Sequence, residues 1–322
     1  MIKNIIGFIL SLGVFLYGMH LMSSSLDTLA TNKLKDILHK LTSNKYLGVL
    51  IGTAITAVIH SSSATTVILI GLLNSHLITL NQATWIILGA NIGTTVTGLM
   101  IALDLGQSAI YFCGIGLILM LSKNKLMYFG RVIVALGLIF LAMDSMSVAL
   151  IPLQSSPYFI ELFSKLNNPL TAIITGTIFT AMIQSSTASV GVLQTIYQKG
   201  LISFAMATNV IYGQNIGTCI TALLASINGD RNSKRLTVIH ILINVIGTIA
   251  FVGASYFIPF VEFIGSLTPN YMMQIAYMHT FFNIISTIIL LPFDNTLIYL
   301  AYKIIPISRK EGYSANKYSC SN

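Results

Sequence analysis

Residues 52–103 read GTAITAVIHSSSATTVILIGLLNSHLITLNQATWIILGANIGTTVTGLMIAL, and residues 176–227 read GTIFTAMIQSSTASVGVLQTIYQKGLISFAMATNVIYGQNIGTCITALLASI. The two stretches align without a gap at an offset of 124 residues. Many of the identical positions are Gly, Ser, Asn or Thr, which a helix facing lipid normally avoids. The chain therefore contains two copies of a polar element within strongly apolar sequence.

The composition around these copies is that of a polytopic membrane protein. Of the 322 residues, 55% are hydrophobic and 8% are charged, whereas soluble proteins carry about 25% charged residues. The mean hydropathy is +0.82. Apolar stretches that are predicted to span the membrane, most of them near the ~20 residues required, are 4–24, 82–103, 107–121, 127–150, 204–227, 234–256 and 272–300.

The first apolar stretch resembles a cleaved signal peptide, because Lys3 precedes it and small residues follow it. However, four of its residues recur in the second half of the chain at the same offset of 124. These are Gly13, Met19, Met22 and Leu26, which recur as Gly137, Met143, Met146 and Leu150. The repeat therefore includes this stretch, and we interpret it as a retained span.

Several other kinds of function are not indicated. The three cysteines have no paired or metal-type spacing, so the sequence predicts neither a disulfide framework nor a transition-metal site. The net charge of +8 comes from loops without a basic and aromatic patch, so the predicted partner is the lipid bilayer and not nucleic acid. No cofactor is expected. The serines lack a paired base, so we do not predict an enzyme.

Two segments pose a question of topology. Residues 47–75 and 169–198 each consist of two apolar arms that are too short to cross a bilayer separately. Each segment is therefore either one interrupted span or a re-entrant hairpin. With two hairpins, 14 of the 17 Lys and Arg residues lie on one side of the membrane, against 12 if both segments cross. Since positive charge accumulates on the cytoplasmic side, the hairpins are favoured.

With hairpins, each repeat contains three full spans, so the second copy is inverted relative to the first. The predicted fold is an all-α membrane protein with two inverted-topology repeats, each of three transmembrane helices and one re-entrant hairpin, followed by a final transmembrane helix. The N-terminus is expected outside the cell membrane and the C-terminus in the cytoplasm. The expected divisions are a first repeat (1–125), a second repeat (126–256), a final transmembrane segment (257–305) and a polar cytoplasmic tail (306–322).

The serine-rich turns of the two hairpins are candidate anion sites. They are His60, Ser61, Ser62 and Ser63, and their copies Gln184, Ser185, Ser186 and Thr187. A serine that caps a helix leaves backbone N–H groups free, and a helix N-terminus with hydroxyl donors favours anions. The alternative is that these hydroxyls only join helices, as is common in membrane proteins. Their duplication at matching places favours a shared site for one small oxyanion.

The second duplicated motif indicates a cation site. It is Gly89, Asn91, Gly93, Thr94 and Thr95 in the first copy, and Gly213, Asn215, Gly217, Thr218 and Cys219 in the second. Glycines in mid-span would loosen the helix and free carbonyl oxygens, and Asn and Thr add neutral oxygens, which suit Na⁺. The alternative is that the glycines only allow close helix packing.

Other polar residues lie within apolar stretches. The pairs His240/Asn244 and His279/Asn283 have helical spacing, and interhelical hydrogen bonding is the favoured interpretation. Asp144 and Asp294 lie at membrane depth, where a functional role is the default hypothesis. His20 aligns with Asp144 across the repeat and shows no further pattern.

The motifs HSSSATT and QSSTASV, each followed by G-x-N-I-G-T, resemble those of the Na⁺/phosphate cotransporter family. The resemblance covers residues 1 to about 300 and implies a phosphate site at the tips with Na⁺ nearby. It assigns phosphate to Ser61, Ser62, Ser63, Ser185, Ser186 and Thr187. It assigns Na⁺ to His60, Gln184, Asn91, Thr94, Thr95, Asn215 and Thr218. A homodimer is also implied by resemblance.

Two departures from the family pattern bear on the ion chemistry. Thr187 replaces the last serine and keeps its hydroxyl, whereas His60 replaces a glutamine and becomes cationic in acid. The expected function is sodium-coupled phosphate symport by alternating access. The alternatives are transport of another small oxyanion, phosphate export on the same fold, and a membrane sensor or channel that does not transport.

Overall fold

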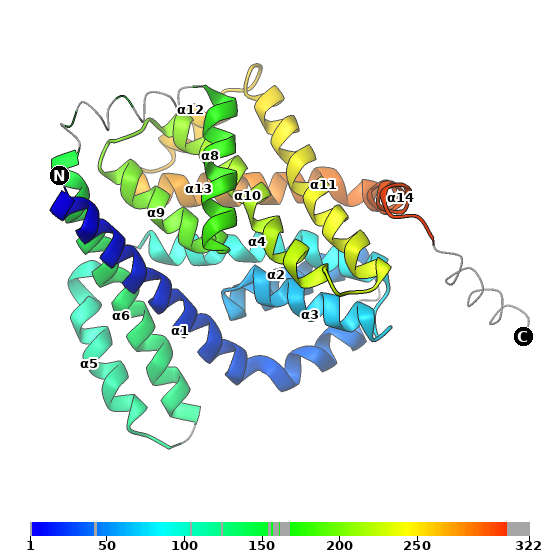
Figure 1. The fold of residues 1–322 in the computed structure, drawn as a ribbon, viewed down its shortest axis with the longest axis horizontal. Coiled ribbons are helices and arrows are strands. Elements are labelled where there is room, and N and C mark those ends of the chain that lie inside the picture. The colour runs from blue at the N-terminus through cyan, green and yellow to red at the C-terminus, as the bar shows by residue number, and fades with distance from the viewer. Residues whose placement is uncertain are drawn as a thin grey trace, which may run out of the picture.

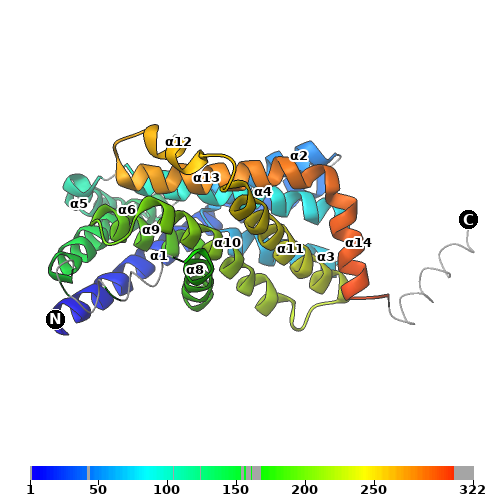
Figure 2. The same cartoon turned by 90° about the horizontal axis from the view of Figure 1, so that it is seen from above.

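The computed structural model describes residues 2–41, 44–103, 105–123, 125–153, 156, 161 and 168–307, with side chains from residue 3 and, in the first helix, as far as residue 29. The described residues form helices and connecting turns without any strand. The expected tail beyond 307, and Lys165, lie outside the described residues. Figures 1 and 2 show the helices from two directions.

The bounds of the helices repeat at the offset found in the sequence. α1 (Ile2–Leu41) precedes a helix pair, α2 (Lys45–Ile59) and α3 (Ser62–Asn74), which α4 (Leu80–Ile101) follows. α6 (Lys125–Leu150) precedes a second pair, α8 (Pro169–Ile183) and α9 (Ser186–Gln198), which α10 (Phe204–Ser226) follows. The bounds of α8 and α9 are those of α2 and α3 moved by 124 residues.

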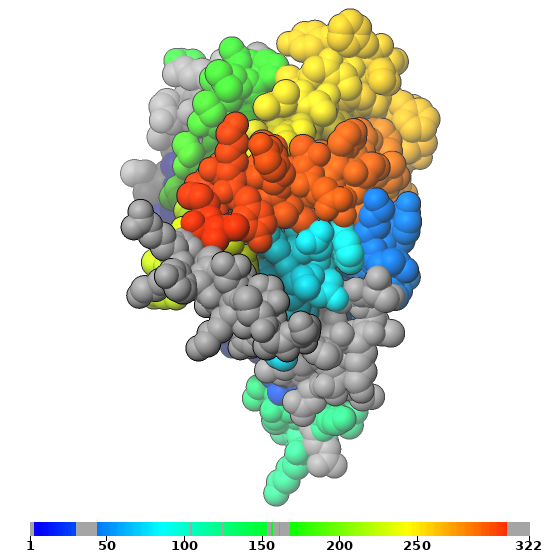
Figure 3. Space-filling model, turned by 90° about the vertical axis from the view of Figure 1, so that its right-hand side faces the viewer, coloured from blue at the N-terminus to red at the C-terminus, as the bar shows by residue number. Residues whose placement is uncertain are grey.

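The remaining elements are shorter or lie after the second pair. They are η1 (Gly106–Ser108), α5 (Ala109–Met120), η2 (Ile151–Leu153), α11 (Arg231–Ala254), α12 (Phe260–Ser266), α13 (Tyr271–Leu290), η4 (Leu291–Phe293) and α14 (Asp294–Ile304). The last helical stretch breaks at Pro292, where η4 separates α13 from α14. On the face shown in Figure 3, α13 and α14 form an orange and red band that crosses the molecule.

Five stretches in the described part of the chain are long and apolar enough to cross a membrane. They correspond to five of the seven expected spans: Lys3–Leu29, Leu80–Ile101, Lys125–Leu150, Arg231–Ala254 and Tyr271–Ile304. The chain is therefore an all-α, multi-pass membrane protein. α10 has 23 residues but is too polar to be among these stretches.

The helix in the stretch 107–121 is too short to cross the bilayer core. α5 has 12 residues, or ~18 Å of helix at 1.5 Å per residue, against ~30 Å of bilayer core. The helices of the first pair have 15 and 13 residues, so each reaches only ~20 Å. Those of the second pair have the same lengths.

Each helix pair packs against the long helix that follows it, and glycine makes this contact close. A Cβ atom at Gly89 of α4 would overlap the carbonyl oxygen of Val49, and one at Gly213 of α10 would overlap that of Ile173. Thr53 donates to the carbonyl oxygen of Gly89 at 3.1 Å, and the equivalent bond from α8 to Gly213 has the same length. The backbones therefore touch directly.

The apolar core consists of three clusters. The first joins α2, α3 and α4 to α11 and α14, and the second joins α9 and α10 to α12 and α13. The third joins α1 and α6 to buried residues of α4, α9 and α13. Each helix pair thus has its own apolar support, and α1 lies beside the region where the two pairs meet (Figure 1).

Candidate functional site

The first tip, residues 60–63, turns the chain sharply between α2 and α3. α2 ends at His60, which adopts a left-handed conformation (φ 57°) and donates its N–H to the carbonyl oxygen one turn earlier. Ser61 is extended, and its hydroxyl oxygen accepts the N–H of Ala64 at 3.1 Å. This cap satisfies one N–H of the first turn of α3. The N–H groups of Ser62 and Ser63 have no helical carbonyl to bond and remain available.

The second tip, residues 184–187, repeats this conformation. Gln184 is left-handed (φ 59°) and ends α8. Ser185 is extended and caps α9 by accepting the N–H of Ala188 at 3.2 Å. A left-handed conformation is uncommon for residues other than glycine, and both tips adopt it at equivalent positions. The N–H groups of Ser186 and Thr187 are therefore available in the same way.

Each tip is braced by a buried hydroxyl pair one turn away from it. In the first pair, the Oγ1 atoms of Thr56 and Thr65 lie 3.0 Å apart. In the second, Thr180 donates to the hydroxyl of Ser189 at 2.7 Å. These bonds join the two helices of a pair across the turn and hold the tip in place. Some of the duplicated polar residues therefore have a structural role, because they join helices beside the tips.

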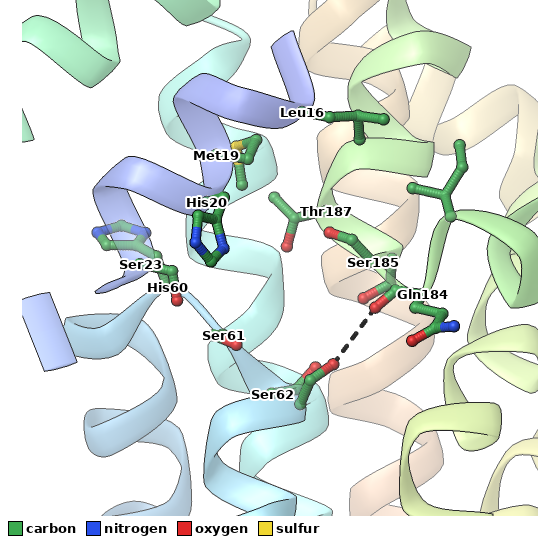
Figure 4. Close-up of a pocket in the computed structure, with 13 residues that line it drawn as sticks. Leu16, Met19, His20, Ser23, His60, Ser61, Ser62, Gln184, Ser185 and Thr187 are labelled. Carbon is green, nitrogen blue, oxygen red and sulfur yellow. Dashed lines mark hydrogen bonds between the residues drawn. The ribbon is translucent and has the colours of Figure 1, made fainter. Parts of the chain in front are cut away.

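The two tips face each other and touch (Figure 4). Ser63 of the first tip donates its hydroxyl to the backbone carbonyl oxygen of Gln184 at 3.5 Å, drawn as a dashed line in Figure 4. The N-termini of α3 and α9 therefore meet at one place. Since each helix N-terminus carries a partial positive charge, this place favours an anion.

Three residues at the tips are buried but keep unpaired, accessible hydroxyls. Ser62, Ser186 and Thr187 are 7%, 5% and 5% exposed, and their hydroxyls have no hydrogen-bond partner among the residues that the structure describes. Their oxygens are not among the buried unpaired atoms of the described residues, so the hydroxyls are free to bond a ligand at the tips.

A cavity of about 280 Å³, which we call the anion cavity, opens at the tips. All eight tip residues line it, together with Ile183 and one face of α1, formed by Leu16, Met19, His20 and Ser23. Among these lining residues there is no Lys, Arg, Asp or Glu. An anion in this cavity would be held by N–H groups, hydroxyls and helix dipoles, which favours binding that is easily reversed.

A second convergence lies beside this cavity. Three pairs of repeat-equivalent residues surround one void that is too small for a water molecule: Ser62 and Ser186, Asn91 and Asn215, and Thr94 and Thr218. The amide nitrogen of Asn215 donates to a carbonyl oxygen of its own helix, and that of Asn91 donates toward Asn244 at 3.5 Å. The side-chain oxygens of both asparagines keep their acceptor capacity, in a set of lining residues that is rich in neutral oxygen.

The remaining residues of the expected Na⁺ set lie elsewhere. Thr95 donates to the carbonyl oxygen of Ile92 in its own helix and lines neither space. His60 lines the anion cavity, but its Nδ1 lies 2.7 Å from the hydroxyl of Thr97. Gln184 also lines the anion cavity. Four of the seven residues assigned to Na⁺ are thus brought together, and the other three are not among them.

The expectation that the glycines of this motif free carbonyl oxygens is wrong. α4 and α10 run through the motif as continuous helices. Gly93 and Gly217 instead lie against the backbone of α2 and α8, where a Cβ atom would clash. The alternative interpretation, close packing, therefore describes the glycines, while the Asn and Thr side chains between them reach the void.

The buried histidines also differ from expectation. Asn244 makes the expected interhelical contacts, to Asn91 and to the sulfur of Cys219 at 3.3 Å. The rings of His240 and His279 do not make the expected hydrogen bonds between helices. Both nitrogens of His240 and Nδ1 of His279 have no partner in the described residues. Asn283 donates to a carbonyl oxygen in its own helix.

The two aspartates have structural neighbours. Asp294 is 4% exposed and accepts the indole N–H of Trp85 at 2.7 Å, which joins α14 to α4. Asp144 lies against Gly106, where a Cβ atom would overlap its carboxylate. Neither lines the anion cavity. The default hypothesis of a functional carboxylate at these positions therefore has no support at the tips.

Sequence reasoning missed four residues at or near the site. His20 and Ser23 of α1 line the anion cavity. Gln194, in α9, donates to the carbonyl oxygens of Gly98 and Met272 at 3.0 and 3.1 Å, and Gln214 donates to that of Ser189 at 2.9 Å. His20, Gln194 and Gln214 have no matching residue in the other repeat, so a search for duplicated residues could not find them, whereas Ser23 matches Ser147 but belongs to no duplicated motif.

Comparison with known proteins gives a family match over most of the chain. A family model described as Na⁺/Pi-cotransporter matches residues 14–148 and 158–267. No solved structure matches the chain.

Three relatives are informative. The chain is 29% identical to the uncharacterized protein YqeW of Bacillus subtilis (strain 168), over 91% of this chain and 95% of that protein. It is 26% identical to the putative inorganic phosphate export protein YjbB of Escherichia coli (strain K12), over 89% of this chain, and spans about half of that protein, 53%. It is 27% identical to human sodium-dependent phosphate transport protein 2B, over 56% of this chain and 22% of that protein.

Proposed function

The chain belongs to the Na⁺/Pi-cotransporter family, and we propose that it is a sodium-coupled symporter of inorganic phosphate with one central site between its two tips. The names of YjbB and of human transport protein 2B support phosphate as the cargo. The family is a transporter family, and the chemistry of the tips is that of reversible binding.

One observation carries this proposal. The three pairs Ser62/Ser186, Asn91/Asn215 and Thr94/Thr218, each related by the 124-residue offset, converge on a single point beside the anion cavity. Equivalent residues of two repeats meet at one point when an axis relating the repeats passes through it. A site on such an axis, formed by helix ends from both repeats, is the plan of transporters built from inverted repeats.

Phosphate would bind in the cavity of about 280 Å³. The available N–H groups of residues 62, 63, 186 and 187 would donate to its oxygens, as would the unpaired hydroxyls of Ser62, Ser186 and Thr187. Bonds from these groups to an anion are charge-assisted and so are stronger than neutral ones. Two helix dipoles add to the attraction without introducing a fixed positive charge.

Sodium would bind at the six-residue convergence. Hydroxyl and amide oxygens are the hard, neutral ligands that such a cation takes, and half-helix ends commonly supply them in transporters. Because the void is too small for a water molecule, a cation held there would be bound by the protein oxygens without water. Ser62 and Ser186 line both spaces, so the position of a cation would affect the phosphate site directly.

The proposed topology places the two helix pairs as re-entrant hairpins that enter from opposite sides of the cell membrane. The supports are helices too short to cross alone and the charge asymmetry of the loops. Residues 1–125 and 126–256 then form the inverted repeats, and 257–305 form the final segment. Alternating access would open the tips to one side at a time.

Export is the second candidate function, because YjbB is named for it. A symporter and an exporter with the same fold differ in the gradient that drives them. Loss of phosphate from preloaded cells that depends on this protein and persists with an inward Na⁺ gradient would select export.

The test of cargo and coupling uses purified protein in liposomes. Uptake of radiolabelled phosphate is compared under inward Na⁺, Li⁺ and H⁺ gradients, from about pH 5.5 to about pH 8. Symport predicts accumulation of phosphate above its equilibrium level with the Na⁺ gradient. Uptake that ignores all three gradients would reject coupling, and flux that never exceeds equilibrium would indicate a channel.

A further inference from the structure

One wall of the anion cavity is not duplicated. The tips supply two equivalent walls, but α1 supplies a third through Leu16, Met19, His20 and Ser23. These four residues have the spacing of a single helix face. The position equivalent to His20 in the second repeat is Asp144, which lies against Gly106 and outside the cavity.

The polar groups on this wall are unpaired. His20 is exposed and Ser23 is half-buried, and their side chains have no hydrogen-bond partner among the residues that the structure describes, so both are open to a ligand in the cavity. Figure 4 shows the ring of His20 between the first tip and Thr187 of the second tip. His20 is therefore placed to contact an anion that the tips hold.

His20 adds a nitrogen acceptor to a cavity in which the hydroxyls and the side chains of His60 and Gln184 can also accept. The available backbone groups there are N–H donors, and one backbone acceptor, the carbonyl oxygen of Gln184, already receives the hydroxyl of Ser63. A neutral imidazole has one N–H donor and one nitrogen acceptor. At neutral pH inorganic phosphate keeps at least one P–OH group, which needs an acceptor, whereas sulfate has none.

We propose that His20 is a binding residue that selects protonated oxyanions, accepting the P–OH of phosphate on one ring nitrogen and thereby discriminating against sulfate. The inference rests on the proposed function, since it assigns a further residue to the same phosphate site. Sulfate has no proton to donate to this nitrogen and would lose that hydrogen bond.

The test measures phosphate uptake by the reconstituted protein at about pH 7.5, with and without competing sulfate, in four variants. His20→Leu removes the acceptor and should weaken phosphate binding about tenfold, the scale of one hydrogen bond to a charged group. His20→Gln keeps a donor and an acceptor and should restore most of the affinity.

His20→Lys offers donors only, so sulfate should compete better for uptake by this variant than for uptake by the natural protein. His76→Gln changes a histidine between α3 and α4, outside the anion cavity, and should leave uptake unchanged.

The outcomes separate this inference from the proposed function. If the natural protein takes up no phosphate, the proposed function fails. If it takes up phosphate and His20→Leu has unchanged affinity and unchanged sulfate competition, only the inference fails. Thermal unfolding of each purified variant distinguishes lost binding from misfolding, and a folded His20→Gln variant with no better affinity than His20→Leu would also overturn the assignment.

Discussion

The hydroxyl of Ser63 and the backbone carbonyl oxygen of Gln184 lie 3.5 Å apart, although 121 positions separate the two residues in the sequence. This contact joins the N-terminal ends of two helices from different repeats. It brings into one place polar groups that each repeat supplies separately, so a small anion can contact both helix ends at once.

The backbones of α4 and α10 touch the helix pairs so closely that one added methyl group is expected to destabilise the protein. Gly89→Ala and Gly213→Ala place a Cβ atom on a carbonyl oxygen, and overpacking of this kind costs about 1–3 kcal/mol or more. Both variants should unfold at lower temperature in detergent. The control is Gly71→Ala in α3, where nothing lies within 4 Å and helix propensity favours alanine. Equal stability of the three variants would contradict the contact.

The bond between Trp85 and Asp294 is expected to be structural. Trp85→Phe leaves a carboxylate that is 4% exposed without its indole donor at 2.7 Å, which should cost about 1–3 kcal/mol. Asp294→Asn should cost less after Trp85→Phe than alone, because the partner is already gone. Thermal unfolding of both single variants and the double variant measures this coupling. A folded Asp294→Asn variant that loses transport would instead restore a functional role for the carboxylate.

His60 is expected to make sodium binding depend on pH. Its Nδ1 contacts Thr97 at 2.7 Å, one turn along α4 from Thr94 of the proposed cation site. A cationic imidazole repels a nearby cation, so the Na⁺ concentration for half-maximal uptake should rise as acid protonates His60. His60→Gln should reduce that rise. The measurement is the Na⁺ dependence of uptake at about pH 6 and about pH 8, and an unchanged rise in the variant would exclude His60.

The asparagines of the convergence are expected to act on sodium more than on phosphate. Asn91→Ala and Asn215→Ala each remove one amide oxygen from the set of six residues. Each should raise the Na⁺ concentration for half-maximal uptake several-fold, since loss of one ligand weakens a weakly held cation. Thr95→Val is the matched control, because Thr95 bonds within its own helix. A similar rise in that control would show that the position on α4, and not the oxygen, is what matters.

The sequence predicted the tips well because their structure is local. Serine caps, the break in each apolar segment and the 124-residue offset all lie within short stretches, so the ends of α2, α3, α8 and α9 follow from them. The placement of Asn91 and Asn215 was also predicted, because the repeat pairs them. The sequence alone could not show that Thr95 and His60 do not line the void between Asn91 and Asn215. This depends on how α4 is oriented against its neighbours.

The third wall was not predictable, because it arises from tertiary packing. His20 has an aspartate at the equivalent position and no local motif, so only the placement of α1 beside both tips reveals it. The short α5 shows a related limit. The apolar run 107–121 was counted as a span although it is short for one, and in the structure a 3₁₀ turn at Gly106–Ser108 precedes a helix of 12 residues.

Equilibrium binding of radiolabelled phosphate to the purified protein in Na⁺ shows whether the two tips form one phosphate site. Ser62→Ala and Ser186→Ala are compared with Ser75→Ala, which changes an exposed serine at the far end of α3. A single shared site should bind one phosphate per chain, with either tip variant weakening the whole isotherm about tenfold and Ser75→Ala leaving it unchanged. Two phosphates per chain, with each tip variant removing one and sparing the other, would contradict a shared site.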